Sequence, residues 1–389
     1  MGGGGPRRGI QGLAGLAGRA TQPSGRRPSC IGAPRVTAKP QRTDPSLGAS
    51  VTMSDVARMA GVSESTVSRA LSGSPLVSDA TRERVGALAR QAGYLVNEQA
   101  SNLARGQTRT IEVMFPIEAG TLQHVSDPFF VDMLAALTDA LAGHGYDALL
   151  TRSPPWDAER PGCAYLGGRA GGVIFVGQGR HADAIDAFAR QHRRVVTWGA
   201  VRPEQTACVV GSDNAGGARA ATRHLLGLGR RRVAFMGDRT LPEIAQRYAG
   251  YAGALAEAGL ALDPALVFDA PFDVAGARAA AAPLAGLADR FDGLVAASDM
   301  IALAAIAALR DGGVSVPGDV GVVGFDDIAL AEHVYPALTT VHQRIKRGGE
   351  VMVAEMMTML EGGEARSHVL PGELVVRRSC GAGARGAGS

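Results

Sequence analysis

Residues 52–71 carry the pattern that most restricts how this chain folds, because they predict two short helices joined by a tight turn. Thr52 and Asp55 have the spacing of a capping box, which begins a helix. The apolar stripe of this helix is expected at Val56, Met59 and Ala60. Gly61 then stands where the turn requires a positive φ, which glycine adopts without steric cost. The pattern indicates a helix-turn-helix, with an ordinary helical hairpin as the alternative.

The second helix is expected to begin after Ser63, a favoured N-cap residue, and a third helix at Ser78. Within the second helix, Val67 and Leu71 are expected to face the core. The outward positions are Glu64, Ser65, Ser68 and Arg69. An exposed helix after such a turn fits the major groove, with its N-terminal residues at the base edges. The segment therefore favours binding to double-stranded DNA.

Residues 97–105 predict one further helix, which Asn97 caps and Gly106 ends. Nine residues form only a marginal helix in water, so order here is expected to depend on docking to DNA. Leu103 is the only large apolar side chain of this segment. It either packs on the core or enters the minor groove as a wedge between base steps.

From residue 110 onward, short apolar runs alternate with segments of helical spacing. The strand candidates include 111–115, 148–151, 172–176, 195–198, 232–236, 293–297 and 320–325. Helical patterns include 130–141, 220–228 and 301–309. This alternation predicts an α/β architecture with parallel, doubly wound sheets. The stretch is long for a single sheet of this kind, so two lobes are expected, with a ligand at the carboxyl ends of their strands.

Charge is distributed unevenly along the chain. Residues 1–50 hold eight Lys or Arg and one acidic residue, whereas residues 111–389 carry a net charge of −6. Positive charge next to the predicted DNA-reading segment favours a polyanionic partner there and not along the core. No apolar run reaches the roughly 18 residues of a membrane span, and the first 50 residues lack the apolar centre of a secretory signal. We therefore expect a cytoplasmic protein whose four scattered cysteines are reduced.

Composition and patterning together predict five segments. Residues 1–50 are rich in Gly, Pro, Ser and Arg with almost no apolar periodicity, which predicts a disordered tail. An upstream start codon and an organelle transit peptide are alternative explanations of this tail. The segments expected next are a DNA-binding domain at 51–96, a hinge helix and linker at 97–109, a two-lobed core at 110–380 and a flexible tail at 381–389.

The chain contains motifs that are specific in combination. In the head, they include Asp55-Val-Ala-x-x-Ala-Gly-Val-Ser and Thr66-Val-Ser-Arg. In the core, they include Asp127-Pro-Phe-Phe, Arg247-x-x-Gly-Tyr and Val316-Pro-Gly-Asp-Val-x-Val-Val-Gly-Phe-Asp-Asp. With these motifs, the sequence closely resembles the LacI/GalR family of bacterial transcription regulators from residue 51 to about residue 378. The resemblance implies a helix-turn-helix, a hinge helix and a periplasmic-binding-protein-like (type I) core of two lobes. It also implies a homodimer that binds operator DNA and holds a small effector, often a sugar, between the lobes.

In the head, the resemblance places Glu64, Ser65 and Arg69 at base-reading positions. Arg69 is the strongest of these candidates, because Arg forms bidentate contacts with guanine. The positions at which the family contacts phosphates are occupied by Thr52, Ser63, Ser68, Ser78 and Asn97. Leu103 falls at the position of the intercalating hinge leucine. Ser101 departs from the pattern, since many members have Arg there to contact a phosphate.

In the core, the resemblance assigns the effector site to aromatic and polar side chains. Phe129 and Phe130 offer rings that stack on a sugar or a base. The polar positions are Gln178, Arg247, Ser298, Asp299, Asp326 and Gln343. Ser298 stands where the family usually has Asn, which weakens one expected hydrogen bond to the ligand. Taken alone, the two phenylalanines would be core residues, Asp326 part of a turn, and Arg247 a solvated helix residue.

These observations predict a sequence-specific DNA-binding repressor whose operator affinity depends on a bound metabolite, with a sugar as the expected effector. The alternatives are a constitutive regulator with a degenerate pocket and a sugar-binding protein without a regulatory role. An enzyme is disfavoured, because there is no G-x-S-x-G elbow, no P-loop and no metal-spaced His pair. We therefore expect no catalytic residue, metal or cofactor. The segment after Arg378 has no leucine heptads, which favours a dimer over a coiled-coil tetramer.

Overall fold

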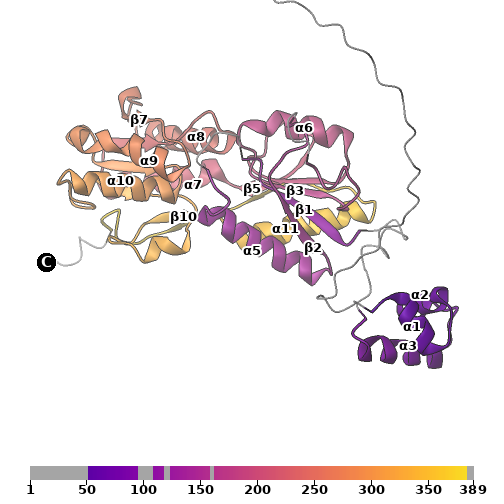
Figure 1. Ribbon diagram of the computed structural model, residues 1–389. Helices are drawn as coiled ribbons and strands as arrows, with labels where there is room; N and C mark the ends of the chain where they lie inside the picture. The colour runs from indigo at the N-terminus through magenta and orange to yellow at the C-terminus, as the bar shows by residue number, and fades with distance from the viewer. Residues whose placement is uncertain (1–50, 95–107, 118–122, 158–161, 383–389) are drawn as a thin grey trace, which may run out of the picture. The chain divides into compact units, whose positions relative to one another are not determined.

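The computed structural model describes residues 51–94, 108–117, 123–157 and 162–382 (Figure 1). The chain divides into two units, residues 1–95 and 96–389. The predicted tail at 1–50, all but the first two residues of the predicted tail at 381–389, and the hinge residues Asn97 and Leu103 lie outside the described residues, so these predictions stay open. Within the described part of the chain, no helix is long and apolar enough to span a membrane.

The described part of the first unit contains three helices whose ends follow the predicted caps. The helices are α1 (Met53–Ala60), α2 (Glu64–Leu71) and α3 (Asp79–Gln91). Thr52 Oγ1 accepts the N–H of Asp55 at 3.3 Å, and the Asp55 carboxylate accepts the N–H of Thr52 at 3.0 Å, which completes the capping box. Gly61 ends α1 with a φ of 64°, and Ser63 Oγ caps α2 by accepting the N–H of Thr66 at 3.2 Å. The predicted helix-turn-helix is therefore confirmed.

The buried face of α1 differs from the predicted apolar stripe at two positions, Ala57 and Met59. Met59 is 48% exposed, so the prediction that it belongs to the apolar stripe is wrong. The residues that α1 buries against Val67 and Val85 are Val56, Ala57 and Ala60. At about 100° per residue, Met59 lies roughly a quarter turn beyond the centre of that face. Its side chain therefore points away from the core of the head.

The second unit begins with a six-stranded sheet that forms lobe 1. The strand order is β11-β5-β4-β3-β1-β2, and every neighbouring pair is parallel. The strands are β1 (Thr110–Met114), β2 (Asp147–Thr151), β3 (Val173–Val176), β4 (Val195–Trp198), β5 (Cys208–Ser212) and β11 (His368–Leu370). Strands β5 and β11 were not among the sequence-based candidates. The helices are α5 (Pro128–Gly143), η1 (Gly179–His181), α6 (Ala182–Gln191) and α11 (Ile345–Leu360).

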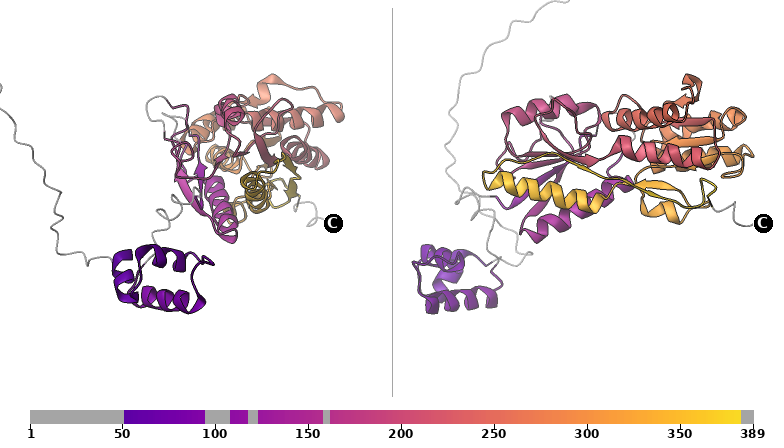
Figure 2. Two further views of the ribbon diagram at one scale, coloured as in Figure 1. Left: turned by 90° about the vertical axis from the view of Figure 1, so that its right-hand side faces the viewer. Right: turned by 180° about the vertical axis from the view of Figure 1, so that it is seen from behind.

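Side-chain alternation along the strands divides the core of lobe 1 into two layers. Ile174 and Val176 pack with α5 and α11 on one face, whereas Val173 and Phe175 pack with α6 on the other. Successive residues of a strand point to opposite faces, so a strand that is apolar throughout is covered on both sides. Figure 2 shows α5 and α11 together on one side of this sheet.

Lobe 2 repeats this organisation with four parallel strands in the order β7-β6-β8-β9. Its strands are β6 (Val233–Met236), β7 (Val267–Phe268), β8 (Gly293–Ala296) and β9 (Gly321–Val323). The helical segments are α7 (Asn214–Gly227), α8 (Pro242–Glu257), η2 (Pro264–Leu266), α9 (Val274–Ala281), η3 (Ala282–Leu287), α10 (Asp299–Asp311) and η4 (Ala329–Glu332). A short antiparallel pair, β10 (Thr340–His342) and β12 (Glu373–Val375), completes it. The predicted two-lobed α/β core with parallel sheets is confirmed.

The chain passes between the two lobes three times. The passages follow β5, β10 and β11, and lead into α7, α11 and β12 respectively (Figure 1). Each lobe is therefore assembled from segments that are distant in sequence. Hydrogen bonds join the three passages, from the N–H of Asp213 to the carbonyl of Leu370 and from Ser212 Oγ to Gln343 Oε1.

Lobe 2 depends on a close approach between α7 and α8. A Cβ built on Gly250 of α8 would lie 2.0 Å from the backbone oxygen of Ala215, whereas a Cβ on Gly227 of α7 would meet nothing within 4 Å. We expect Gly250→Ala to lower the free energy of unfolding by about 3 kcal/mol, because the helices must separate. Gly227→Ala is the matched control and should be neutral or stabilising by up to about 1 kcal/mol. Calorimetric unfolding of both variants checks this, and equal melting temperatures would contradict it.

Candidate functional site

The outer side of the helix-turn-helix gathers the residues that the sequence associates with DNA. All seven described members are exposed: Thr52, Ser63, Glu64, Ser65, Ser68, Arg69 and Ser78. Arg58 and Arg82 form ion pairs with acidic residues of their own helices. Arg69 forms no ion pair with any residue that the structure describes, so its guanidinium is available to an external partner.

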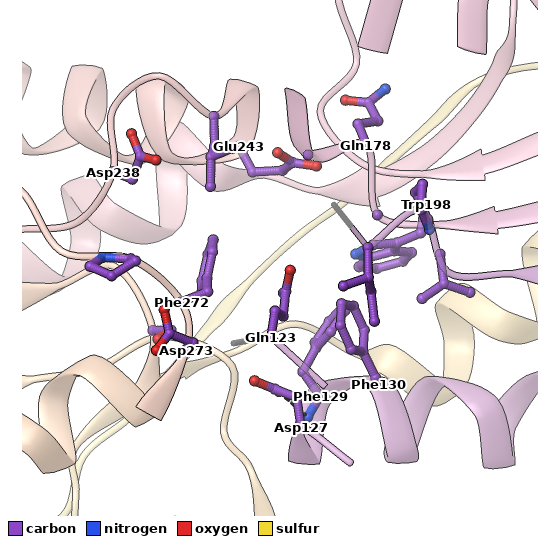
Figure 3. A pocket seen from close by; sticks show the side chains of 18 of the residues that line it. Gln123, Asp127, Phe129, Phe130, Gln178, Trp198, Asp238, Glu243, Phe272 and Asp273 are labelled. Carbon is purple, nitrogen blue, oxygen red and sulfur yellow. Dashed lines mark hydrogen bonds between the residues drawn. The ribbon is translucent and has the colours of Figure 1, made fainter. Parts of the chain in front are cut away.

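A cavity of about 220 Å³ lies between the two lobes of the core, at the carboxyl ends of their strands (Figure 3). Five of its lining residues end or follow strands β1, β4, β6, β8 and β9: Pro116, Trp198, Asp238, Ser298 and Asp326. This is the position at which doubly wound α/β folds bind ligands. Seven of the eight core residues that the sequence associates with an effector line it: Phe129, Phe130, Gln178, Arg247, Ser298, Asp326 and Gln343.

Lobe 1 supplies an aromatic wall (Figure 3). The ring centroids of Phe129 and Phe130 lie 5.7 Å apart, and those of Phe129 and Trp198 lie 6.2 Å apart. Phe130 also meets Phe115 edge-on at 5.2 Å, which fixes it from behind. Phe130 and Trp198 are buried, whereas Phe129 is half-buried. The wall therefore presents a preformed apolar surface, which suits the faces of a sugar ring or a base.

Arg247 of α8 is the only guanidinium held inside the buried floor of the described cavity. Its Nε donates to Asn214 Oδ1 at 2.8 Å, and Nη1 donates to the carbonyl of Ala297. Nη1 also lies 3.7 Å from Asp326 Oδ1, and Cζ lies 3.7 Å from the centroid of the Phe325 ring. Burial lowers the pKa of Arg247, and the carboxylates around it oppose that shift. The side chain is therefore fixed in position before any ligand arrives.

Asp326 faces Arg247 from the segment after β9. Its carboxylate accepts a hydrogen bond from Gln343 Nε2, and Gln343 Oε1 in turn accepts one from Ser212 Oγ at 2.9 Å. Burial raises the pKa of the Asp326 carboxyl well above its usual range, and Arg247 partly opposes this. Asp326 and the next residue, Asp327, have φ values of 128° and 59°, which are rare for residues other than glycine. Such strain persists only where the surrounding structure imposes it, and it clusters at binding sites.

Ser298 and Asp299 lie at the start of α10 but occupy different places. Ser298 lines the cavity, and its Oγ caps α10 by accepting the N–H of Ile301 at 3.2 Å. Asp299 is not among the lining residues. Its carboxylate lies behind the wall, where it accepts the N–H of Ile328 at 2.9 Å and the hydroxyl of Thr340 at 2.5 Å. The structure thus places Asp299 as a support of the loop after β9.

Several lining residues escaped the sequence analysis as site candidates. They are Gln123, Asp127, Trp198, Asp238, Glu243, Phe272 and Asp273. Trp198 could have been found, because it ends a predicted strand, and Asp127 belongs to a motif that was recognised for other reasons. Glu243 and Asp273 sit at the starts of helices α8 and α9, where acidic residues are ordinary caps. Nothing local in the sequence distinguishes these two from structural residues.

Known proteins share both units of this chain. The family model described as "Bacterial regulatory proteins, lacI family" matches residues 52–97, and that of a "Periplasmic binding protein-like domain" matches residues 222–380. The HTH-type transcriptional regulator CelR of Thermobifida fusca is 33% identical over 335 residues, which cover 84% of this chain and 98% of that protein. The chain belongs to the LacI family. As a member of this family, it is a DNA-binding transcriptional regulator.

Solved structures of other members resemble this LacI-family regulator. The "transcriptional regulator CelR-cellobiose complex" superimposes with a TM-score of 0.63 at 33% identity, covering 85% of this chain and 99% of that chain. The lac repressor dimer bound to operator and the anti-inducer ONPF gives a TM-score of 0.74 at 24% identity, with the same coverage. The second likeness shows the fold alone.

The buried carboxyl of Asp299 makes stability depend on pH. Burial raises the pKa of Asp299 to about 6. Between about pH 4 and pH 6, the folded regulator therefore keeps a proton on Asp299 that the unfolded chain has already released. The contribution of Asp299 to the free energy of unfolding therefore becomes unfavourable as pH rises from about 4 to 6, and it is constant above pH 6. In Asp299→Asn, we expect the unfolding free energy relative to wild type to rise by about 2 kcal/mol between pH 4 and pH 7. Urea unfolding at the two pH values measures this, and a pH-independent difference would contradict it.

Proposed function

We propose that this LacI-family regulator reads operator DNA with α2 and changes its DNA affinity when a sugar binds between the lobes of its core. One observation carries the proposal: a single chain combines an exposed recognition helix with an aromatic-walled, polar-floored cavity at strand ends. In this proposal, the regulator is a repressor that acts in the cytoplasm. It is a homodimer, because one helix-turn-helix reads only a few base pairs and a second half-site is needed for a specific operator. Catalysis has no part in this proposal.

The exposed face of the head supports the DNA-reading role. Glu64 and Ser65 lie in the first turn of α2, where a helix in the major groove meets the bases. Arg69 follows on the same helix with no competing ion pair among the described residues. Thr52, Ser63, Ser68 and Ser78 are also exposed, and their hydroxyls can donate to phosphate oxygens, which receive many of the hydrogen bonds in such complexes. Asn97 and Leu103 extend this proposal to the hinge.

The floor and wall of the cavity support a sugar as the effector. Sugars present ring faces, which stack on aromatic side chains, and hydroxyls, which need both donors and acceptors. Phe129 and Trp198 offer aromatic rings for stacking, and Arg247 and Asp326 offer a donor and an acceptor for hydroxyls. Gln178 and Gln343 add amides, and Asp299 acts indirectly by holding the segment that carries Asp326. The relative CelR was solved with cellobiose, which agrees with this class of ligand.

A constitutive regulator that no metabolite controls is the second candidate. It is motivated by Ser298, a short side chain at a position where the family usually has Asn. The two candidates differ in a single measurement, namely whether any ligand that stabilises the folded protein also alters its affinity for DNA.

The first prediction of this proposal concerns Arg69. We expect Arg69→Ala to weaken binding to a selected operator by about 1–3 kcal/mol, because a bidentate contact to guanine is lost. Binding to random DNA should weaken no more than in Arg90→Ala, which removes one exposed Arg from α3 and serves as the matched control. Fluorescence anisotropy with both DNAs at fixed salt measures the difference. Equal losses on operator and random DNA would make Arg69 a phosphate contact instead.

The second prediction concerns Asp326. A thermal-shift screen of sugars and purines identifies ligands of the folded state by mass action. For such a ligand, we expect Asp326→Asn to bind at least about tenfold more weakly, because a charge-assisted acceptor next to Arg247 is lost. Operator affinity without ligand should stay within about twofold of wild type. Asp311→Asn, which changes an exposed carboxylate of the same lobe, is the control, and an unchanged ligand response in Asp326→Asn would place Asp326 outside the site.

A further inference from the structure

The side chains that line the cavity are unequal in charge. Five carboxylates face it: Asp127, Asp238, Glu243, Asp273 and Asp326. Two guanidiniums face it, those of Arg180 and Arg247. Asp127 comes from lobe 1 and the other four acids from lobe 2, so the acidic residues border the cavity from both sides (Figure 3).

Each guanidinium already has a carboxylate beside it, so neither offers an unmatched positive charge to an anion. Arg247 already donates to Asn214 and to a backbone carbonyl, and it lies beside Asp326 over the face of Phe325. Arg180 lies 2.8 Å from Asp238, a contact that joins the loop after β3 in lobe 1 to the loop after β6 in lobe 2. Both positive charges are therefore matched by carboxylates that line the same cavity.

Three carboxylates remain without a cation at ion-pair distance in the described structure: Asp127, Glu243 and Asp273. Asp127 Oδ1 accepts the N–H of Phe129 at 3.0 Å, and Asp273 Oδ1 accepts the N–H of Gly276 at 2.7 Å, so both are oriented by the backbone. Burial raises the pKa of Asp127 and of Glu243, and Arg247 partly opposes the shift of Glu243. Burial disfavours negative charge at this place, so a further anion would be disfavoured as well.

The cavity is lined by buried polar and aromatic side chains, which distinguishes it from an acidic patch on the surface. Gln178 and Ser298, which are 2% and 1% exposed, line it together with the buried rings of Phe130 and Trp198. Apolar walls reduce the screening of charge inside, so that an unmatched carboxylate acts strongly on a bound ligand.

We propose that this cavity selects hydroxyl-rich ligands without an anionic group, namely neutral sugars and amino sugars, and that it rejects sugar phosphates and uronic acids. Carboxylates accept hydrogen bonds from hydroxyl and ammonium donors, whereas phosphate and carboxylate oxygens have no donor to offer them. An anionic sugar would also bring its charge within several ångströms of three unmatched acids. This inference rests on the proposed function, since it specifies the chemical class of the same effector.

Matched sets of sugars test the inference on the full-length protein. Each set holds a hexose, its 2-amino-2-deoxy form, its 6-phosphate and its uronic acid, in the gluco, galacto and manno series, with cellobiose and cellobionate as a larger pair. Isothermal titration at pH 7.5 and fixed salt gives each affinity. In any series that binds, we expect the anionic member to be at least about 100-fold weaker than the neutral one.

The double variant Glu243→Gln/Asp273→Asn tests whether the unmatched carboxylates cause the preference for neutral over anionic sugars. Asn retains the capping acceptor at residue 273, and Gln retains the length of Glu243. We expect the ratio of neutral to anionic affinity to fall by roughly tenfold or more. A structural disturbance alone would weaken both ligands equally and leave the ratio unchanged. Asp311→Asn is the control and should leave the ratio as in wild type.

The outcomes separate the inference from the proposed function. An anionic sugar that binds within tenfold of its neutral counterpart overturns the inference and leaves a sugar-responsive regulator in place. An unchanged ratio in the double variant also overturns it, because the unmatched carboxylates would then not be the source of selectivity. If no sugar of any charge binds, the proposed function fails and the inference fails with it.

Discussion

The buried polar chain that links the two lobes is the interaction on which the core depends. It runs from Ser212 through Gln343 to Asp326, and from Arg247 to Asn214. Its members sit at two of the passages between the lobes and on the strand ends that meet there. Buried polar groups are costly unless each finds a partner, so this chain fixes how the passages lie against one another. Its hydrogen bond from Gln343 also helps to hold Asp326 in its strained backbone conformation, with the carboxylate at the cavity.

Because of this arrangement, a ligand in the cavity contacts both lobes and the passages that join them. The floor belongs to segments that hold the lobes together, and the walls belong to both lobes. A ligand that binds one arrangement of the lobes better than another shifts the population toward it, by no more than the difference in its binding free energies. Polar groups that are already positioned lower the entropic cost of binding and sharpen selectivity. The excess of carboxylates over cations adds a preference for ligand charge to this geometry.

Much of the fold follows from local patterns. The caps at Thr52 and Ser63 and the positive φ of Gly61 are encoded within a few residues, and the structure has them where they were predicted. The apolar runs of lobe 1 and lobe 2 likewise predicted most of the parallel strands. Met59 shows the limit of this approach, since hydrophobicity alone does not tell which flank of a short helix is covered. Strand β11 shows another, because it has only three residues and pairs with β5, which is distant in sequence.

The sequence by itself determined a helix-turn-helix head and a two-lobed α/β core, because caps, turns and apolar periodicity act over a few residues. It also indicated most of the polar and aromatic residue types that line the cavity. Only the tertiary structure decided which side chains share the cavity. It brought Trp198, Glu243 and Asp273 to its walls and moved Asp299 behind them. The physical reason is that three passages between the lobes juxtapose strand ends far apart in the chain. Charge balance at such a place is a property of the assembled site, and no local segment encodes it.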